Sequence, residues 1–136
     1  MEVDTISSQV KKCKRTQVAL IFADHDMDCV TCGRYGNCEL LQLARNLGVQ
    51  KAPFTGKFIA ERKVDHTDPA IELDVNKCVR CMRCVEVCNK IQGIGALRID
   101  EIGTKAGVCL NGTKDWVDST KCVRCGQCIM VCPTGL

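Results

Sequence analysis

Residues 77–88 read KCVRCMRCVEVC, and residues 121–133 read KCVRCGQCIMVCP. Both contain the spacing C-x2-C-x2-C-x3-C. Three thiolates at two-residue intervals allow a tight loop to bind three corners of a cubic 4Fe-4S cluster. The fourth Cys lies on the helix that follows and points away from its own loop, so that it reaches the other cube. The repeat therefore predicts two 4Fe-4S clusters that exchange their fourth ligands.

This exchange assigns four cysteines to each cluster of the repeat. One set is Cys78, Cys81, Cys84 and Cys132. The other set is Cys88, Cys122, Cys125 and Cys128. Only the second copy ends in the Cys-Pro of the bacterial motif, because Asn89 follows Cys88, but the number of ligands is unchanged. Paired C-x2-C elements also form four-Cys zinc sites. The third and fourth Cys of each run favour clusters over zinc and over a disulfide framework.

The chain has 136 residues, enough for one or two small domains, and contains 13 cysteines. Its first residues lack the basic start and apolar run of a signal peptide, and no stretch approaches the length of a transmembrane helix. We therefore expect the thiols to be metal ligands in the reducing cytoplasm, with no direct insertion into a membrane.

The formal net charge is +3. An oxidised cluster held by four thiolates carries about −2, and one held by three thiolates and an imidazole about −1. Three such sites would bring the loaded protein to about −2, which argues against nucleic acid as a partner. Basic side chains beside the predicted ligands either offset cluster charge or are simply solvated; they are Lys77, Arg80, Arg83, Lys90, Lys121 and Arg124.

Residues 5–23 are predicted to form a helix that is capped by Asp4 or Thr5. Side chains at three-to-four-residue spacing form the stripe that we expect to face the core: Ile6, Val10, Cys13, Gln17, Leu20 and Ile21. A basic run at residues 11–15 lies beside this stripe. It is either a solvated face or a docking surface for an acidic partner.

A different metal motif, His25-x3-Cys29-x2-Cys32-x5-Cys38, follows this helix. Three thiolates and one imidazole supply one tetrahedral site. The spacing alone leaves open a zinc knuckle and a third 4Fe-4S cluster. The neighbouring repeat favours the cluster, because a third cube would extend a chain of redox centres.

The rest of the first half reads as a short helix and a linker. Asn37 is expected to cap a helix that ends at Leu47, before Gly48. Residues 53–70 read as a linker with at most a short strand around residues 57–60. The two cysteines outside all motifs, Cys13 and Cys109, are expected to be small buried apolar residues.

The second half is predicted to alternate short strands and helices around the two Cys loops. The expected strands are residues 70–75, 96–100, and a hairpin of 108–110 with 113–117; the expected helices are residues 84–91 and a segment running from the second loop towards Leu136. The predicted fold class is α+β: a small helical domain with the His/Cys site at residues 1–52, the linker, and a two-cluster ferredoxin-like domain at residues 71–136.

The His25 motif ahead of a double ferredoxin run resembles the iron-sulfur region of iron-only (FeFe) hydrogenases. It is similar also to the large iron-sulfur subunit of respiratory complex I and to the large subunit of NAD-dependent formate dehydrogenases. Residues 83–93, RCVEVCNKIQG, look like the version of the first ferredoxin half in those families. The resemblance spans nearly the whole chain. It implies that one 4Fe-4S cluster is held by His25, Cys29, Cys32 and Cys38.

Those families usually begin with a 2Fe-2S domain and continue into a large catalytic domain, and neither lies within these residues. The chain is therefore expected to be an internal segment or a reduced electron-transfer subunit. We predict a relay of three 4Fe-4S clusters that works with other redox domains or subunits of an oxidoreductase. It has no predicted catalytic residue and is not expected to be an enzyme by itself. The alternative is a metal-stapled docking module with zinc at the His25 site and a two-cluster ferredoxin.

Overall fold

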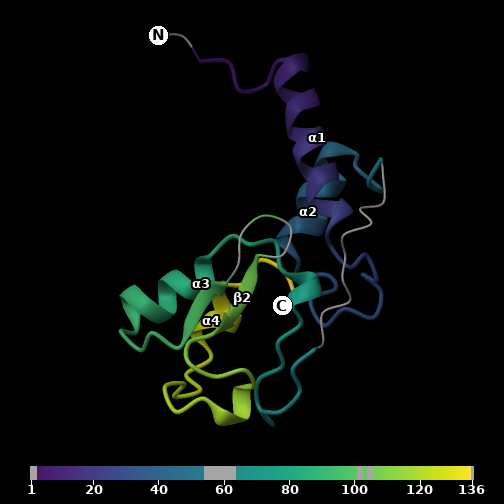
Figure 1. Ribbon diagram of the computed structural model, residues 1–136. Helices are drawn as coiled ribbons and strands as arrows, with labels where there is room; N and C mark the ends of the chain where they lie inside the picture. The colour runs from purple at the N-terminus through teal and green to yellow at the C-terminus, as the bar shows by residue number, and fades with distance from the viewer. Residues whose placement is uncertain (1–2, 54–63, 101–102, 104–105, 136) are drawn as a thin grey trace. The chain divides into compact units, whose positions relative to one another are not determined.

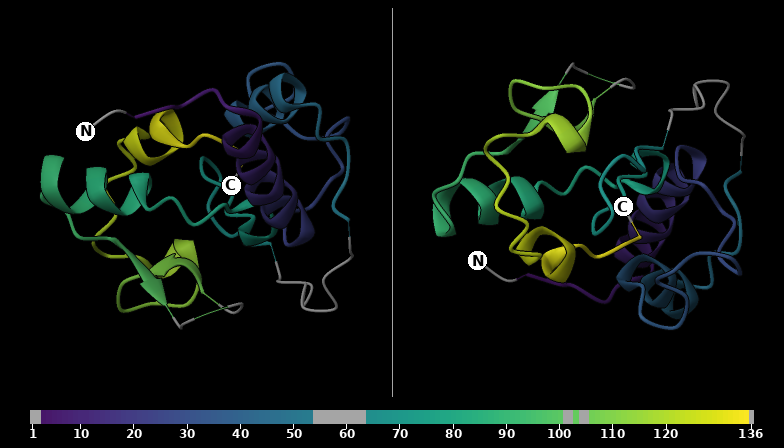
Figure 2. Two further views of the ribbon diagram at one scale, coloured as in Figure 1. Left: turned by 90° about the horizontal axis from the view of Figure 1, so that it is seen from above. Right: turned by 90° about the horizontal axis from the view of Figure 1, so that it is seen from below.

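The computed structural model describes residues 3–53, 64–100, 103 and 106–135 (Figures 1 and 2). The chain divides into two compact units, Met1–Ile59 and Ala60–Leu136. The short strand predicted around residues 57–60 lies outside the described residues, and the predicted domain limits stay predictions. Within the described ranges, no helix combines the length and the apolar character that crossing a membrane requires.

The first unit contains two helices, α1 (Ser8–Ala23) and α2 (Glu39–Leu47). The Ser7 hydroxyl caps α1 by accepting a hydrogen bond from the Val10 N–H group at 3.4 Å. The prediction that Asp4 or Thr5 caps this helix was wrong. The Asp4 carboxylate instead accepts hydrogen bonds from the two N–H groups at positions 6 and 7, which form a turn before the helix begins.

The second helix, α2, starts one residue later than predicted. Cys38, and not Asn37, stands at the N-cap position, and its carbonyl accepts a hydrogen bond from Gln42 at 3.1 Å. The C-terminal end agrees with the prediction. Gly48 adopts the left-handed conformation with φ of 67°, and its N–H group closes the last turn on Arg45.

The helix α1 buries a different face from the one predicted. Its buried residues are Val18 and Phe22, whereas Ile6 is 76% exposed and Leu20 is 50% exposed. With 9 residues against 16, α2 is about 14 Å long and α1 about 24 Å. Because α2 lies beside the C-terminal half of α1 (Figure 1), it covers only that part. The prediction that Cys13 is buried was also wrong, since its side chain is exposed.

The second unit combines short helices with a two-stranded antiparallel sheet. Strand β1 (Leu97–Asp100) pairs with β2 (Gly107–Leu110), and Leu97 lies opposite Leu110. Helix α3 (Arg83–Glu86) continues into a π-helical turn, η2 (Val87–Ile91). The helices α3 and α4 (Gln127–Val131) lie side by side (Figure 2), and α3 also contacts β1. Mixed helical and strand content agrees with the predicted class.

Two predicted strands are not strands in the structure. In residues 70–75 the only pairing is one bridge between Leu73 and Asp65. In residues 113–117 the ladder is replaced by a helical turn, η4 (Trp116–Asp118). The N–H group of Trp116 is bound by the Asp65 carboxylate at 2.7 Å and that of Val117 by the Thr67 hydroxyl at 3.1 Å. These side-chain acceptors replace the strand partner that a hairpin would need.

The fourth Cys of each motif has a different backbone setting. Cys88 lies within the π-helical turn η2, because Asn89 allows the helix to continue. Cys132 lies beyond the end of α4 in an extended conformation, with φ of −69° and ψ of 125°. A residue before proline is disfavoured in a helix, so Pro133 ends α4 at Val131. The prediction that this helix runs on towards Leu136 was therefore wrong.

The apolar core of the second unit forms around the cysteines of the first motif. Cys78, Cys84 and Cys88 belong to one buried cluster together with side chains from the sheet and from the flanking segments: Ile71, Leu73, Val85, Ala96, Leu97, Val108, Leu110 and Trp116. Cys122 and Cys128 of the second motif pack against this cluster while partly exposed. Cysteines thus occupy positions in this core where aliphatic side chains would ordinarily lie.

Candidate metal centres

The two Cys loops have the same backbone. Arg80 and Arg124, two residues after the first Cys of each loop, have φ of 56° and 53°. Met82 and Gly126, immediately before each helix, have φ of 63° and 72°. The backbone N–H group of each arginine donates a hydrogen bond to the first Cys sulfur of its loop, at 3.3 Å in the first loop and 3.4 Å in the second. Such left-handed turns point successive N–H groups inwards, where they suit an anionic centre.

Cys132, from the end of the second motif, neighbours the cysteines of the first loop. Burial, followed by the neighbouring Cys78 and Cys132, raises the pKa of Cys84 to about 12. Burial also raises the pKa of Cys78, and the nearby Cys132 and Cys81 act in the same direction. A thiol of this kind becomes a thiolate near neutral pH only when a metal replaces its proton.

Thr134 supports this placement of Cys132. Its side chain is 2% exposed, and its hydroxyl donates a hydrogen bond to the Lys77 carbonyl at 2.8 Å. The same hydroxyl lies 3.8 Å from the Cys132 sulfur. Lys77, which precedes Cys78, is thus joined to the segment that carries Cys132.

The reciprocal group consists of Cys88 and the three loop cysteines of the second motif. Cys88, Cys122, Cys125 and Cys128 line one cavity. Burial raises the pKa of Cys128, and the nearby Cys122 and Cys125 act in the same direction. The Ala96 N–H group donates to the Cys88 sulfur at 3.3 Å in a buried position. Four sulfurs around one cavity are a donor set suited to a 4Fe-4S cluster.

The His25 motif lies in the first unit, in the loop between α1 and α2. His25 is 8% exposed, and burial raises the pKa of Cys29, followed by the effects of Cys38, Cys32 and nearby aspartates. The three thiols are therefore neighbours. Across the described part of the chain, no three His, Cys, Asp or Glu side chains converge closely enough to hold a single metal ion.

One residue beside the second Cys loop, Asp68, belongs to no sequence motif and was not predicted. Asp68 has a fully buried carboxylate, and the Nε atom of Arg124 lies 2.6 Å from it. The hydrogen bond from the Ala70 N–H group, with Arg124, holds the pKa of Asp68 below its usual value. Because Arg124 belongs to the second Cys loop, this ion pair anchors that loop to residues 56 positions earlier in the chain.

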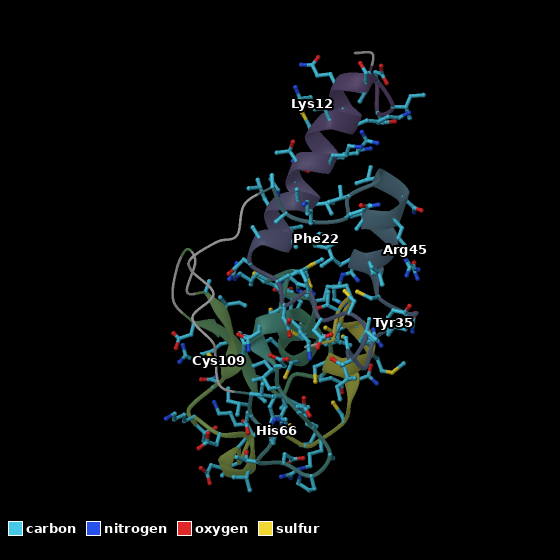
Figure 3. The ribbon with its side chains drawn as sticks, turned by 90° about the vertical axis from the view of Figure 1, so that its right-hand side faces the viewer. Lys12, Phe22, Tyr35, Arg45, His66 and Cys109 are labelled. Atoms are coloured by element: carbon cyan, nitrogen blue, oxygen red, sulfur yellow. The ribbon has the colours of Figure 1, made fainter. Side chains whose placement is uncertain are left out.

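Cys109, the second cysteine outside the motifs, lies on β2 and is half-buried. Figure 3 labels its side chain and that of His66, which belongs to the same unit. Burial raises the pKa of this thiol, against the opposing effect of Arg98. Its predicted role as a small packing residue is therefore only partly met, because one side of the thiol is open to solvent.

Comparison with protein families divides the chain in the same way as its motifs. Residues 14–53 match the NADH-ubiquinone oxidoreductase-G iron-sulfur binding region. Residues 77–136 match the 4Fe-4S dicluster domain. The first match contains the His25 motif and the second contains both Cys loops.

The chain is similar in sequence to members of three kinds of oxidoreductase. The chain is 37% identical over 97 residues to the NADP-reducing hydrogenase subunit HndD of Solidesulfovibrio fructosivorans, covering 71% of this chain and 16% of the relative. It is 30% identical over 129 residues to the NADH-quinone oxidoreductase subunit 3 of Thermus thermophilus, covering 85% and 16%. It is 33% identical over 103 residues to the putative formate dehydrogenase YrhE of Bacillus subtilis, covering 74% and 10%.

A solved structure extends the similarity over the fold. In the crystal structure of an NAD+-reducing NiFe hydrogenase in the H2-reduced state, one chain superposes with a TM-score of 0.86 at 26% identity. The match covers 96% of the present chain and 55% of the hydrogenase chain. The present chain thus spans less than a fifth of the length of the three relatives and about half of the solved one.

Proposed function

The chain is a homologue of the iron-sulfur regions of hydrogenases, complex I subunits and formate dehydrogenases, and we propose that it relays electrons through three 4Fe-4S clusters. When bound, these clusters supply reversible one-electron transfer. The protein supplies their ligands, excludes water and provides hydrogen-bond donors to their sulfurs. One cluster would be held by Cys78, Cys81, Cys84 and Cys132, and a second by Cys88, Cys122, Cys125 and Cys128.

The observation that supports the proposal is that the fourth cysteine of each motif lies beside thiols of the other motif. Cys132 neighbours Cys78 and Cys84, and Cys88 shares a cavity with the thiols of the second loop. A pair of separate zinc sites has no use for this exchange, because each ion would take its ligands from adjacent pairs. Two cubes whose fourth ligands come from the other motif require it.

The third cluster would be held by His25, Cys29, Cys32 and Cys38. The support is that these residues lie within the matched NADH-ubiquinone oxidoreductase-G iron-sulfur region and that the three thiols are neighbours beside a buried imidazole. A neutral imidazole in place of one thiolate makes this centre about one charge less negative than the other two.

The chain would act within a larger oxidoreductase and not as an enzyme by itself. Its partners would be other redox domains or subunits, since two of the relatives are named as subunits of a hydrogenase and of an NADH-quinone oxidoreductase. A reducing compartment such as the cytoplasm would keep the ligand thiols available for iron. The candidate parents are a hydrogenase of FeFe type, a formate dehydrogenase and an NADH dehydrogenase.

Anaerobic iron and sulfide analysis tests the number of clusters. We expect about twelve irons and about twelve sulfides per chain after reconstitution, with visible absorbance that bleaches on addition of dithionite. About eight irons and one zinc per chain would instead indicate two clusters and a zinc ion at the His25 site. A colourless protein without iron would refute the relay altogether.

The His25→Ala variant tests the ligand set of the first unit. It is expected to lose about four irons while keeping the EPR signals of the two ferredoxin clusters. His66→Ala is the matched control, because His66 is exposed in the second unit, 3.1 Å from Glu72 and outside any ligand spacing. Three intact clusters in the His25→Ala variant would show that the imidazole is not a ligand.

A further inference from the structure

Trp116 is the single tryptophan of the chain, and it is 2% exposed. Its indole nitrogen Nε1 is buried, and no acceptor among the described residues lies within hydrogen-bonding distance of it. Buried indole N–H groups nearly always have a partner, because desolvating a donor without an acceptor is unfavourable. The missing acceptor therefore points to a group that occupies the space beside the ring in the working protein.

The backbone holds the ring in a defined place. The Trp116 N–H group donates to the Asp65 carboxylate at 2.7 Å, and its carbonyl accepts from the Ser119 N–H group at 3.0 Å. Burial raises the pKa of Asp65, but hydrogen bonds from Thr67 and Trp116 outweigh it and leave the pKa lowered, so this acceptor is ionised at neutral pH. Both ends of the residue are thereby anchored.

The ring lies where the cysteines converge. Trp116 lines the cavity that is also lined by Cys88, Cys122, Cys125 and Cys128. It lines a second cavity with Cys84, Cys128 and Cys132. The first cavity contains a complete set of four thiols, whereas the second contains only two members of the other set. More sulfurs therefore surround the ring in the first cavity, and we expect the acceptor for the indole N–H group to lie there.

We propose that the Trp116 indole N–H group donates a hydrogen bond to a sulfur of the cluster held by Cys88, Cys122, Cys125 and Cys128. This inference rests on the proposed function, because it needs that cluster to be bound. A donor to a cluster sulfur stabilises the more negative, reduced state, so Trp116 raises the reduction potential of this centre relative to an otherwise equal one. Trp116 is then a tuning residue and not a ligand.

The decisive experiment uses the reconstituted full chain labelled with 15N-tryptophan. Because the chain has one tryptophan, any 15N-indole coupling is assigned without ambiguity. Pulsed EPR of the reduced protein is expected to show a 15N coupling and an exchangeable proton that disappears in D2O. Both are expected to vanish in Cys88→Ala, which removes the cluster, and to remain in Cys132→Ala, which removes the other one.

The Trp116→Phe variant gives the second readout. It keeps the buried ring and removes the donor, so the midpoint potential of this one cluster should fall while the iron content stays the same. Val117→Ala is the matched control, since Val117 is the next residue and is 53% exposed. If Trp116→Phe does not fold, the labelled wild-type protein still decides the question.

Three results would overturn the inference alone. The first is a protein with its full iron content but no 15N coupling, and the second is a coupling that survives in Cys88→Ala. Unchanged potentials in a folded Trp116→Phe variant would also overturn it. A chain that binds no iron-sulfur cluster would overturn both this inference and the proposed function, and iron analysis distinguishes that case.

Discussion

The two Cys loops share one backbone but differ in their surroundings. Both carry an arginine in the left-handed region, and both arginines donate an N–H group to the first Cys sulfur. In the first loop Cys78 and Cys84 are buried, whereas in the second Cys122 and Cys128 remain half-buried. Local sequence thus determines the path of each loop, and the tertiary structure determines how much water reaches its sulfurs.

The arginine side chains show the same difference. Arg80 donates from Nε to the Ala106 carbonyl at 2.7 Å, a neutral backbone acceptor. Arg124 donates from Nε to the buried Asp68 carboxylate at 2.6 Å. The more exposed second loop is thus tied by an ion pair to a distant segment of the chain.

The largest expected effect comes from breaking the exchange between the motifs. Cys132→Ala and Cys84→Ala should each remove about four irons, and the double variant should lose no more than either single one, because both residues serve one cluster. Combining Cys132→Ala with Cys128→Ala should instead remove about eight irons. Iron analysis of the four proteins checks this.

The opposite pattern of losses would show that each motif binds its own cluster. In that case Cys132→Ala with Cys128→Ala would cost only about four irons, and Cys132→Ala with Cys84→Ala would cost about eight. Cys109→Ala is the control in both series, because this thiol lies outside the motifs and should leave the iron content unchanged.

The difference in burial should separate the potentials of the two ferredoxin clusters. Reduction adds a negative charge, which a drier environment disfavours, so the cluster of Cys78, Cys84 and Cys132 should have the lower potential. An EPR-monitored redox titration measures both values, and Cys132→Ala identifies which transition belongs to which cluster. A lower potential for the cluster of the second loop would contradict this reading of burial.

Removing the charged anchor should weaken the second loop alone. Asp68→Asn should speed the chelator-driven loss of the second-loop cluster by about tenfold, while the first-loop cluster is lost at the wild-type rate. Asp118→Asn, an exposed substitution on η4, is the control. Visible absorbance and EPR during chelation follow the two losses separately.

The same anchor predicts a pH dependence with a definite sign. The pKa of Asp68 is lowered in the folded protein. The stabilisation that the Asp68 carboxylate gives to the second loop is therefore complete above the ordinary aspartate pKa of about 3.9, and it is lost as pH falls through the lower pKa of the folded protein. Chelator-driven loss of the second-loop cluster should be faster in Asp68→Asn than in wild type by a constant factor from pH 7 down to about 5. This difference in rate should disappear at still lower pH. An excess that grows on acidification would exclude this role.

The smallest effect concerns the residue before each helix. Gly126 has φ of 72° with open space around its missing side chain, so Gly126→Ala should destabilise the second unit by about 1 kcal/mol through backbone strain alone. Met82 has φ of 63°, and Met82→Gly should relieve strain of similar size. Denaturant unfolding of the loaded protein measures both changes.

Gly33→Ala serves as the control for this pair. Gly33 also has open space around it but lacks the left-handed φ, so its substitution should change stability very little. A destabilisation by Met82→Gly as large as that by Gly126→Ala would show that the Met82 side chain contributes more by packing than its backbone costs.

Prediction from sequence succeeded where one local rule acts without competition. Gly48 ends α2 as expected, because a left-handed residue is needed there and glycine adopts it without strain. Prediction failed where a distant side chain takes a backbone group. The expected strand at residues 113–117 is absent because Asp65 and Thr67, some fifty residues earlier, bind its N–H groups. The buried face of α1 was missed because it depends on the length and position of α2.

The sequence by itself determined the iron-sulfur family and the shape of the two Cys loops, because metal-ligand spacing and positive-φ turns are local properties of a few adjacent residues. The tertiary structure alone decided which thiols are buried, which carboxylate holds Arg124 and which ring faces the cysteines of the second loop. These features join residues far apart in the chain. Their energies arise from desolvation and packing, which no spacing within a motif encodes.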